Sequence, residues 1–323
     1  MCLFRGAEMS KLPCKYYLLE NRAILISSED SFFTSKKITD CPFPDSLLSF
    51  MYYDINSWEP RFHEADRALM EFYQTRKPAL LDPVRLLVNA FQNAHPFFAY
   101  LGLDWADRLA QAEGCKDPTK LLPHKELSHI PANLDAMQRQ ILFLFQTVLD
   151  TELKDIDFSA RVHEYEKASR LNRFDFQPMQ ISYEPVGGVI FTDVLHPKNI
   201  YDVIDFSLRE CVRRNIIMRR CKNCGKYFAL TVHGSTEYCS RVFDNRGRTC
   251  KEVGAMRQYA QVHAQDELLK IYRREYKRRF AWIRAGKISQ EAFSAWSREM
   301  QQEKEKCDKG EITRDEFVRS LKR

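Results

Sequence analysis

A group of four cysteines within residues 221–250 limits what this chain can fold into. Their spacing is Cys221-x2-Cys224-x14-Cys239-x10-Cys250, and the other six of the ten cysteines are scattered. The turn of a Cys-x2-Cys pair folds around an ion, so that its two sulfurs form one edge of a tetrahedron. Four thiolates that leave no open position are typical of structural zinc sites. The spacing therefore predicts that these four cysteines bind Zn²⁺ as a cofactor.

Other interpretations of this stretch stay open. The Cys-x10-Cys half is looser than a second Cys-x2-Cys pair, so one chance pair and two unrelated thiols would give the same pattern. His233 is able to replace one cysteine as a ligand. A redox role is disfavoured, because no βαβ pattern surrounds the Cys-x2-Cys pair.

The compartment decides how the thiols are interpreted. No apolar run approaches the length of a membrane span, and residues 1–15 lack the apolar core and the cleavage site of a signal peptide. We therefore expect a cytoplasmic protein with no membrane partner, in which clustered thiols bind metal rather than form disulfides. The isolated cysteines are interpreted as small apolar side chains: Cys2, Cys14, Cys41, Cys115, Cys211 and Cys307.

Charge is distributed unevenly along the chain. Residues 1–210 contain 23 Lys and Arg against 30 Asp and Glu, whereas residues 211–323 contain 27 against 14. The formal net charge of +6 therefore divides into −7 and +13. Such an asymmetry predicts two functional regions, of which the basic one faces a polyanion.

Residue patterns predict a mainly α fold with small β elements, an α+β class. Two short strands around a polar turn at 20–22 are expected over 16–27, followed by a loop-rich stretch over 28–60 with a short helix near 46–52. Apolar residues at a period of 3.6 then predict helices at 61–76, 82–93, 95–114, 133–153 and 158–171. Phe62, Ala65, Leu69 and Phe72 or Tyr73 share a face in the first of these, and Asp82 is expected to cap the second ahead of Pro83.

The pattern changes beyond residue 173. β-like segments at 174–185 and 187–195 predict a hairpin around Pro185-Val186-Gly187-Gly188. A helix over 196–215 carries an apolar stripe of Ile200, Val203, Ile204, Leu208, Cys211 and Val212. Further on, "KYFAL" and "TEYCS" flank His233-Gly234 and predict a second hairpin, which returns Cys239 to the first cysteine pair.

One long helix is expected over 253–284, with Cys250 near its start. Beyond it, "GKISQEAF" recurs as "GEITRDEF" after 24 residues. Gly286 and Gly310 would end helices, and Ser289 and Thr313 would cap the next ones, so the tail is predicted to be a helical hairpin. Together the patterns divide the chain into a mostly helical region (1–173), a β segment with a connecting helix (174–215), a zinc-binding module (216–255) and a basic helix with a two-helix tail (256–323).

The motif "RRCKNCGKYF…YCS…TCKEVGAMRQY" resembles a bacterial family of unknown function with a C-terminal four-cysteine, zinc-ribbon-like module. The resemblance covers about 176–320 and implies no known activity; members often lie near mobile elements. A more distant resemblance is to CGNR-type zinc finger regulators, in which a helical region precedes the finger. Tyr238-Cys239-Ser240 fits their pattern, but Cys250 is followed by Lys-Glu-Val-Gly instead of Gly-Asn-Arg, which weakens any transfer of DNA binding.

Basic residues surround the cysteines and continue along the helix that follows. Phosphate binding needs fixed cations on one face, so this pattern predicts a DNA-binding surface. Its residues are Arg219, Arg220, Lys222, Lys226, Arg241, Arg246, Arg248, Lys251, Arg257, Lys270, Arg273, Arg274, Lys277, Arg278 and Arg279. Aromatic residues among them would stack on bases if exposed: Tyr227, Phe228, Tyr238, Tyr272 and Tyr276. The first hypothesis is therefore a zinc-binding and nucleic-acid-binding regulatory or accessory protein.

The second hypothesis is a zinc-stabilised scaffold that binds a protein partner, or a second copy through its C-terminal helices, without nucleic acid. Helix charges are commonly a solvated face, the acidic half of the chain is able to dock on the basic half, and Tyr227 and Phe228 would then form the small core of the zinc module. We expect no enzyme, because the sequence contains no phosphate-binding glycine loop, no nucleophile elbow and no zinc-protease helix.

Overall fold

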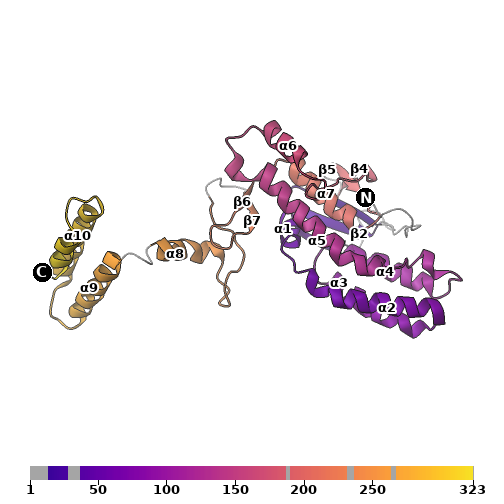
Figure 1. The fold of residues 1–323 in the computed structure, drawn as a ribbon, viewed down its shortest axis with the longest axis horizontal. Helices are drawn as coiled ribbons and strands as arrows, with labels where there is room; N and C mark the ends of the chain where they lie inside the picture. Colours follow the sequence, from indigo (N-terminus) through magenta and orange to yellow (C-terminus); the bar gives the residue numbers. More distant parts are fainter. Residues whose placement is uncertain (1–13, 28–36, 187–189, 231–235, 263–266, 323) are drawn as a thin grey trace. The chain divides into compact units, whose positions relative to one another are not determined.

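A computed structural model describes residues 14–27, 37–186, 190–230, 236–262 and 267–322 of the chain (Figure 1). Two compact units make up the protein: residues 1–221 with 225–237, and residues 222–224 with 238–323. Helices dominate both, with small sheets in the first, which confirms the predicted fold class. None of the described helices is both long and apolar enough to cross a membrane.

The first unit contains a five-stranded antiparallel sheet with the order β3-β2-β1-β5-β4. Its strands are β1 (Cys14–Leu18), β2 (Arg22–Ser27), β3 (Lys37–Pro42), β4 (Ile181–Val186) and β5 (Ile190–Leu195). The hairpin predicted over 16–27 is confirmed, with Tyr17 opposite Ile24. Strand β3 lies where a loop was expected; its residues alternate little in polarity, and pairing with β2 is what makes them a strand.

Strands β4 and β5 confirm the second predicted hairpin, although its turn at 187–189 lies outside the described residues. Pairing begins only at Ile181, so residues 174–180 form no strand. Tyr16 of β1 lies opposite Leu195 of β5, which places segments far apart in the sequence in one sheet. The region 174–215, which the sequence pattern separates from 1–173, therefore shares its sheet and its core with that region.

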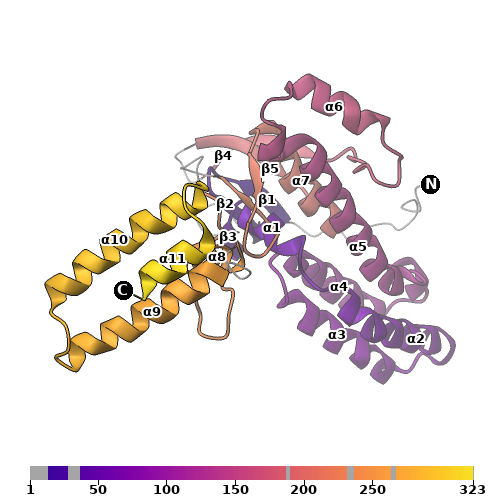
Figure 2. The same cartoon turned by 60° about the vertical axis from the view of Figure 1, so that its left-hand side comes forward.

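Helices cover one face of this sheet and extend beyond it (Figures 1 and 2). They are α1 (Asp45–Phe50), α2 (Glu59–Thr75), α3 (Asp82–Gln92), α4 (Phe98–Ala112), α5 (Glu126–Leu144), α6 (Phe158–Lys167) and α7 (Ile200–Arg213). Helices α2, α3 and α4 lie side by side in both views, and α2 also contacts α5. The predicted stripe of α2 is buried at Phe62, Ala65, Leu69 and Phe72, whereas Tyr73 is half-buried.

Two predicted helix ends differ in the structure. Asp82 is the first residue of α3 rather than its cap, and its carboxylate accepts a hydrogen bond from Arg85 at 2.6 Å. Helix α5 starts seven residues earlier than 133 and contains Pro131 as its sixth residue, where the ring leaves the carbonyl of Leu127 without its usual intrahelical N–H. It ends at Leu144 and continues as a π-helical turn, Phe145–Leu149.

The second unit contains α8 (Cys250–Val262), α9 (Glu267–Arg284), α10 (Gln290–Asp308) and α11 (Arg314–Leu321). Helices α8 and α9 cover most of the single helix expected over 253–284, and residues 263–266 between them lie outside the described residues. Helices α9, α10 and α11 pack around a separate apolar cluster that includes Phe293, Trp296 and Phe317 (Figure 2). The predicted tail is confirmed: Ser289 caps α10, and Thr313 and Glu316 form a capping box at α11.

Candidate metal centre and basic residues

The first cysteine pair lies in a tight turn between two short antiparallel strands, β6 (Met218–Arg220) and β7 (Tyr227–Ala229). The N–H of Cys221 donates to the carbonyl of Lys226 at 3.0 Å, and the N–H of Gly225 donates to the carbonyl of Cys221 at 2.8 Å. Gly225 has a φ of 72°, which a side chain would make unfavourable. The sequence Cys-x2-Cys-Gly therefore encodes a turn that presents both sulfurs on one side.

The predicted partner of β7 was wrong. "KYFAL" pairs with β6 instead of with "TEYCS", and the described residues of the latter form no strand. Hydrogen bonds to the start of α8 hold the segment of Cys239 in place instead. The carbonyl of Cys239 accepts the N–H of Lys251 at 3.1 Å, and the carbonyl of Arg241 accepts the N–H of Cys250 at 3.0 Å. The alternative ligand His233 lies outside the described residues.

Cys250 is the first residue of α8, and the residues beside it fix that helix end. The N–H and the hydroxyl of Thr249 both donate to Glu252 Oε2, at 2.6 and 2.9 Å. The bond from the N–H, and after it the bond from the hydroxyl, hold the pKa of the Glu252 carboxyl below its usual range. A thiolate at a helix N-terminus is favoured by the helix dipole. The motif Thr-Cys-Lys-Glu is thus a helix cap that also places a metal ligand.

Gly254 of α8 provides space for Tyr238, the residue before Cys239. A Cβ atom added at Gly254 would lie 2.2 Å from Cδ1 of the Tyr238 ring, far inside van der Waals contact. The Tyr238 hydroxyl donates to Gln258 Oε1 at 2.5 Å, one turn further along the helix. Tyr238 therefore packs against α8 and does not offer its ring to a base, and the glycine of Lys-Glu-x-Gly is required for this contact.

The four predicted cysteines come together. Their sulfurs all lie within 4.8 Å of one another; Cys221, Cys239 and Cys250 are buried and Cys224 is half-buried. Cys224 and Cys239 are 3.7 Å apart at Sγ. A tetrahedral site with Zn–S bonds of about 2.3 Å has edges of about 3.8 Å, so movements of about 1 Å or less would complete it.

A polar side chain supports this cluster from outside. Asn223 Nδ2 donates to Cys250 Sγ at 3.2 Å, the kind of bond that stabilises thiolate charge. Sequence reasoning did not find Asn223, Glu252 or Gly254. Of these residues only Glu252 could have been predicted, because Thr249 and Glu252 have the spacing of a capping box.

The basic residues predicted to bind nucleic acid have different surroundings. Three are held by internal bonds: Arg219 donates to the carbonyl of Thr236 at 2.8 Å, Arg248 pairs with Asp244, and Arg278 pairs with Glu275. Four others lie near a carbonyl or an aromatic ring of their own unit: Arg220 near the Gly225 carbonyl, Lys226 over Tyr52, Arg257 over Phe243 and Arg279 over Trp296. Arg241 is half-buried. Arg220, Lys226, Arg248, Arg257 and Arg278 are exposed all the same, and so are the remaining residues: Lys222, Arg246, Lys251, Lys270, Arg273, Arg274 and Lys277.

Four of these last seven residues lie on α9. Lys270, Arg274 and Lys277 occupy positions i, i+4 and i+7 and therefore share one face, which we call the α9 basic face. Within the described part of the chain none of these three forms an ion pair. Half a turn away, Leu268 and Tyr272 pack in the apolar cluster of α9–α11. The helix is thus amphipathic in charge, with one face packed and the other exposed and positive.

The aromatic residues proposed to stack on bases are mostly engaged. Tyr227 is buried: its hydroxyl donates to the Asp150 carboxylate, and its N–H donates to the Tyr52 hydroxyl at 2.7 Å. Tyr272 and Tyr276 pack against Trp296 and Phe293. These side chains stabilise the units and are not available to stack on bases.

Comparison with known proteins gives one match. The sequence model of a family of unknown function, DUF6076, matches residues 173–323, a little under half of the chain. The matched part includes the four cysteines and all helices from α7 onward. No curated protein and no solved structure matches.

Proposed function

We propose that the protein binds Zn²⁺ through Cys221, Cys224, Cys239 and Cys250, and that its second unit binds the phosphate backbone of nucleic acid through the α9 basic face. Its role would be regulatory or accessory, in a bacterial, mobile-element setting. The single observation that supports the proposal best is the convergence of four sulfurs at nearly tetrahedral spacing.

Zinc is the ion that such a donor set fits. Thiolates select soft or borderline metals, and four of them at one point describe a closed structural site. Such a site has no position for a substrate or a water, so we propose no catalytic role for the metal. Its contribution would be to order residues 221–250, where the described strands are only three residues long and the other described residues before α8 form turns and loops.

The α9 basic face suits a phosphate backbone better than base edges. Its cations are long and exposed, and about 27 Å of helix is available in 18 residues. Sequence-independent contacts of this kind are governed by counterion release, so affinity falls steeply with salt. The family match implies no partner, so the nucleic-acid part of the proposal rests on the charge distribution alone.

A salt titration with matched variants tests the proposal. Binding to a duplex DNA of random sequence would be measured by fluorescence anisotropy at several salt concentrations. For the double variant Arg274→Gln with Lys277→Gln, we expect the slope of log affinity against log salt to fall by about 2, since each phosphate contact contributes about 0.9. The control is Arg298→Gln with Lys306→Gln on α10, which removes equal charge from exposed positions. Equal slopes in both variants, or no binding by the native protein, would reject this surface.

The scaffold hypothesis remains the second candidate, and one observation bears on its test. The α9–α11 cluster buries Phe293, Trp296 and Phe317. Deleting the tail would expose these side chains and cause aggregation, which would obscure any change in self-association. Phe280 is 43% exposed on α9 and is a better probe. If the helices join two copies, Phe280→Ser should shift the sedimentation coefficient toward the monomer; a native protein already monomeric at high concentration would exclude self-association.

A further inference from the structure

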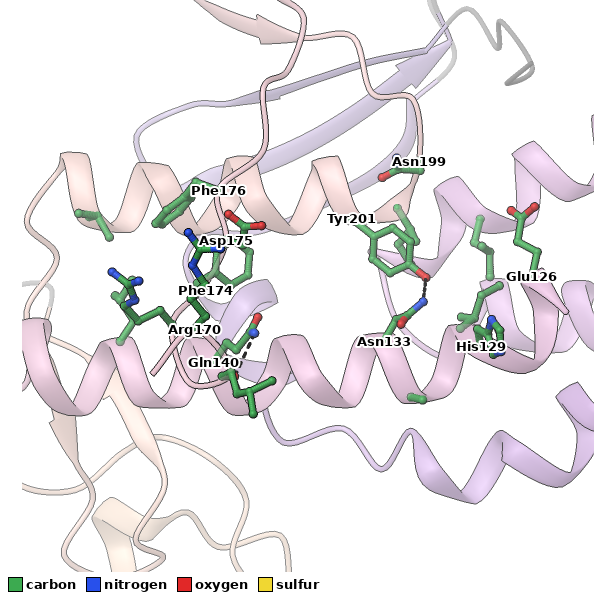
Figure 3. A pocket seen from close by; sticks show the side chains of 18 of the residues that line it. Glu126, His129, Asn133, Gln140, Arg170, Phe174, Asp175, Phe176, Asn199 and Tyr201 are labelled. Atoms are coloured by element: carbon green, nitrogen blue, oxygen red, sulfur yellow. Dashed lines mark hydrogen bonds between the residues drawn. The ribbon is translucent and has the colours of Figure 1, made fainter. Parts of the chain in front are cut away.

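A cavity of about 1520 Å³ lies in the first unit, bordered by α4, α5, α6, α7 and the segment 170–176 (Figure 3). Its volume exceeds the 300–1,000 Å³ that ordinarily suffices for a small-molecule site. Every lining residue belongs to the first unit, and none of them is one of the four cysteines or a residue of the α9 basic face.

One wall is a row of polar side chains on α5. Glu126, His129, Asn133 and Gln140 follow one another at helical spacing and line the cavity in Figure 3. Asn133 Nδ2 donates to the hydroxyl of Tyr201 on the facing helix α7 at 3.3 Å. Apolar residues such as Leu144 and Ile200 complete the lining between these groups. The wall offers amide hydrogen bonds within an otherwise largely apolar space, as ligand pockets do.

The facing wall at one end is the segment 170–176, and it is held in place at its flanks. Gln140 Nε2 donates to the carbonyl of Leu171 at 3.2 Å, and the N–H of Phe174 donates to the hydroxyl of Tyr165 at 2.7 Å. Just beyond it, the N–H of Gln177 donates to Asp205 at 2.8 Å. These bonds tie the segment to α5, α6 and α7, so this wall is formed before any ligand arrives.

The two ends of the cavity differ in charge. At the α4 end, Arg108 is buried but pairs with Asp104 at 2.7 Å and with Glu126 at 2.9 Å, so that group of three has a surplus negative charge. At the other end Arg170 and Arg173 line the cavity together with Glu166 and Asp175, and neither arginine forms an ion pair with a described residue. Nε of Arg173 is buried and has no hydrogen-bond partner among the described residues. Because the two carboxylates balance the two arginines in formal charge, it is this unpartnered N–H of Arg173 that favours an anion at the Arg170 and Arg173 end.

Aromatic rings lie beside those two arginines. Phe174 and Phe176 pack with ring centroids 4.9 Å apart, and Tyr165 and Phe143 with centroids 5.7 Å apart. Phe174, Phe176 and Tyr165 line the cavity, and Figure 3 shows Phe174 and Phe176 grouped with Arg170. We propose that this end of the cavity binds a small organic anion, a carboxylate or a phosphate, that carries an aromatic ring: the arginines would pair with the anion and the rings would contact its flat face.

Three probes of one shape and different charge test this proposal on the full-length protein. They are 1-naphthylacetate, its neutral amide 1-naphthylacetamide and the cation 1-naphthylmethylammonium, with dissociation constants measured by equilibrium dialysis. We expect the carboxylate to bind about tenfold more tightly than the amide, since a charge-assisted pair is worth at least that factor. Arg170→Gln should remove that preference and leave the affinity for the amide unchanged.

Control variants make the result specific. Arg139→Gln changes an exposed arginine on α5 that does not line the cavity, and should leave all three affinities unchanged. Arg173→Gln should act as Arg170→Gln does; if it destabilises the fold, Arg170→Gln alone decides. The proposal is overturned if the cation or the amide binds as tightly as the carboxylate, if Arg139→Gln has the same effect as Arg170→Gln, or if none of the probes shows saturable binding in the millimolar range.

Discussion

Replacing Gly254 by alanine would test how the segment around the cysteines is packed. The added Cβ would lie 2.2 Å from Cδ1 and 2.4 Å from Cε1 of Tyr238. No real Cβ approaches a carbon so closely, so the ring or helix α8 has to move. Tyr238 precedes the ligand Cys239, and Gly254 follows Cys250 by one turn of α8, so such a movement would disturb two ligands at once.

The size of the effect follows from two opposing contributions. Overpacking of this kind costs about 1–3 kcal/mol, whereas alanine gains about 1 kcal/mol over glycine in a helix. In the native background the net loss is then at most about 2 kcal/mol. In a Tyr238→Ala background only the gain of about 1 kcal/mol is left. The two backgrounds should therefore differ by about 1–3 kcal/mol, the cost of the contact itself.

Competition with a chromophoric zinc chelator measures this difference, because order in the segment is coupled to metal binding. The change that Gly254→Ala makes in apparent zinc affinity should differ between the two backgrounds by about 5- to 150-fold. Gly114→Ala is the control, since a Cβ there meets nothing within 4 Å. An identical effect of Gly254→Ala with and without the Tyr238 ring would refute the packing argument.

Three further predictions concern single side chains. Burial lowers the pKa of His95 from 6.5 to about 4, so the folded first unit binds fewer protons than the unfolded chain between these values. Its unfolding free energy should fall as the pH falls through that window, by up to about 3 kcal/mol, and much less in His95→Gln; urea unfolding followed by tryptophan fluorescence checks this. Thr313→Ala should cost the α9–α11 cluster about 1 kcal/mol and should raise the pKa of Glu316, which the N–H and hydroxyl of Thr313 lower, as NMR titration of Glu316 would show. The contribution of Glu316 is present above its ordinary pKa and is lost as the pH falls through the lowered value. Asn223→Ala removes the hydrogen bond to Cys250 and should weaken zinc binding by about 10- to 100-fold in the same chelator assay; unchanged affinity would rule out this supporting role.

Local signals in the sequence identified much of the fold. The stripe of α2, the β1–β2 hairpin and the capped tail helices depend on neighbouring residues, and the structure confirms them. Sequence patterns missed β3 and placed the partner of β7 wrongly, because strand pairing is decided by distant segments. The pairing of β1 with β5 could not be predicted from the sequence for the same reason.

The candidate metal ligands were readable because cysteine chemistry is rare and its spacing is specific. The residues that support them were not, since Asn223 and Gly254 are ordinary residue types whose role appears only when Cys250 and Tyr238 are in place. Basic residues were the least readable. Arg219 and Lys277 look alike in the sequence, yet Arg219 is bound to Thr236 and Lys277 is exposed on α9.

X-ray absorption at the zinc edge of the purified full-length protein tests the central claim most directly. The account predicts one zinc per chain with four sulfur neighbours at about 2.3 Å and no nitrogen or oxygen ligand. Loss of that signal in Cys224→Ser, with oxygen or water in place of one sulfur, would agree with it. A protein that retains no zinc, or a zinc with fewer than four sulfurs in the native chain, would contradict it.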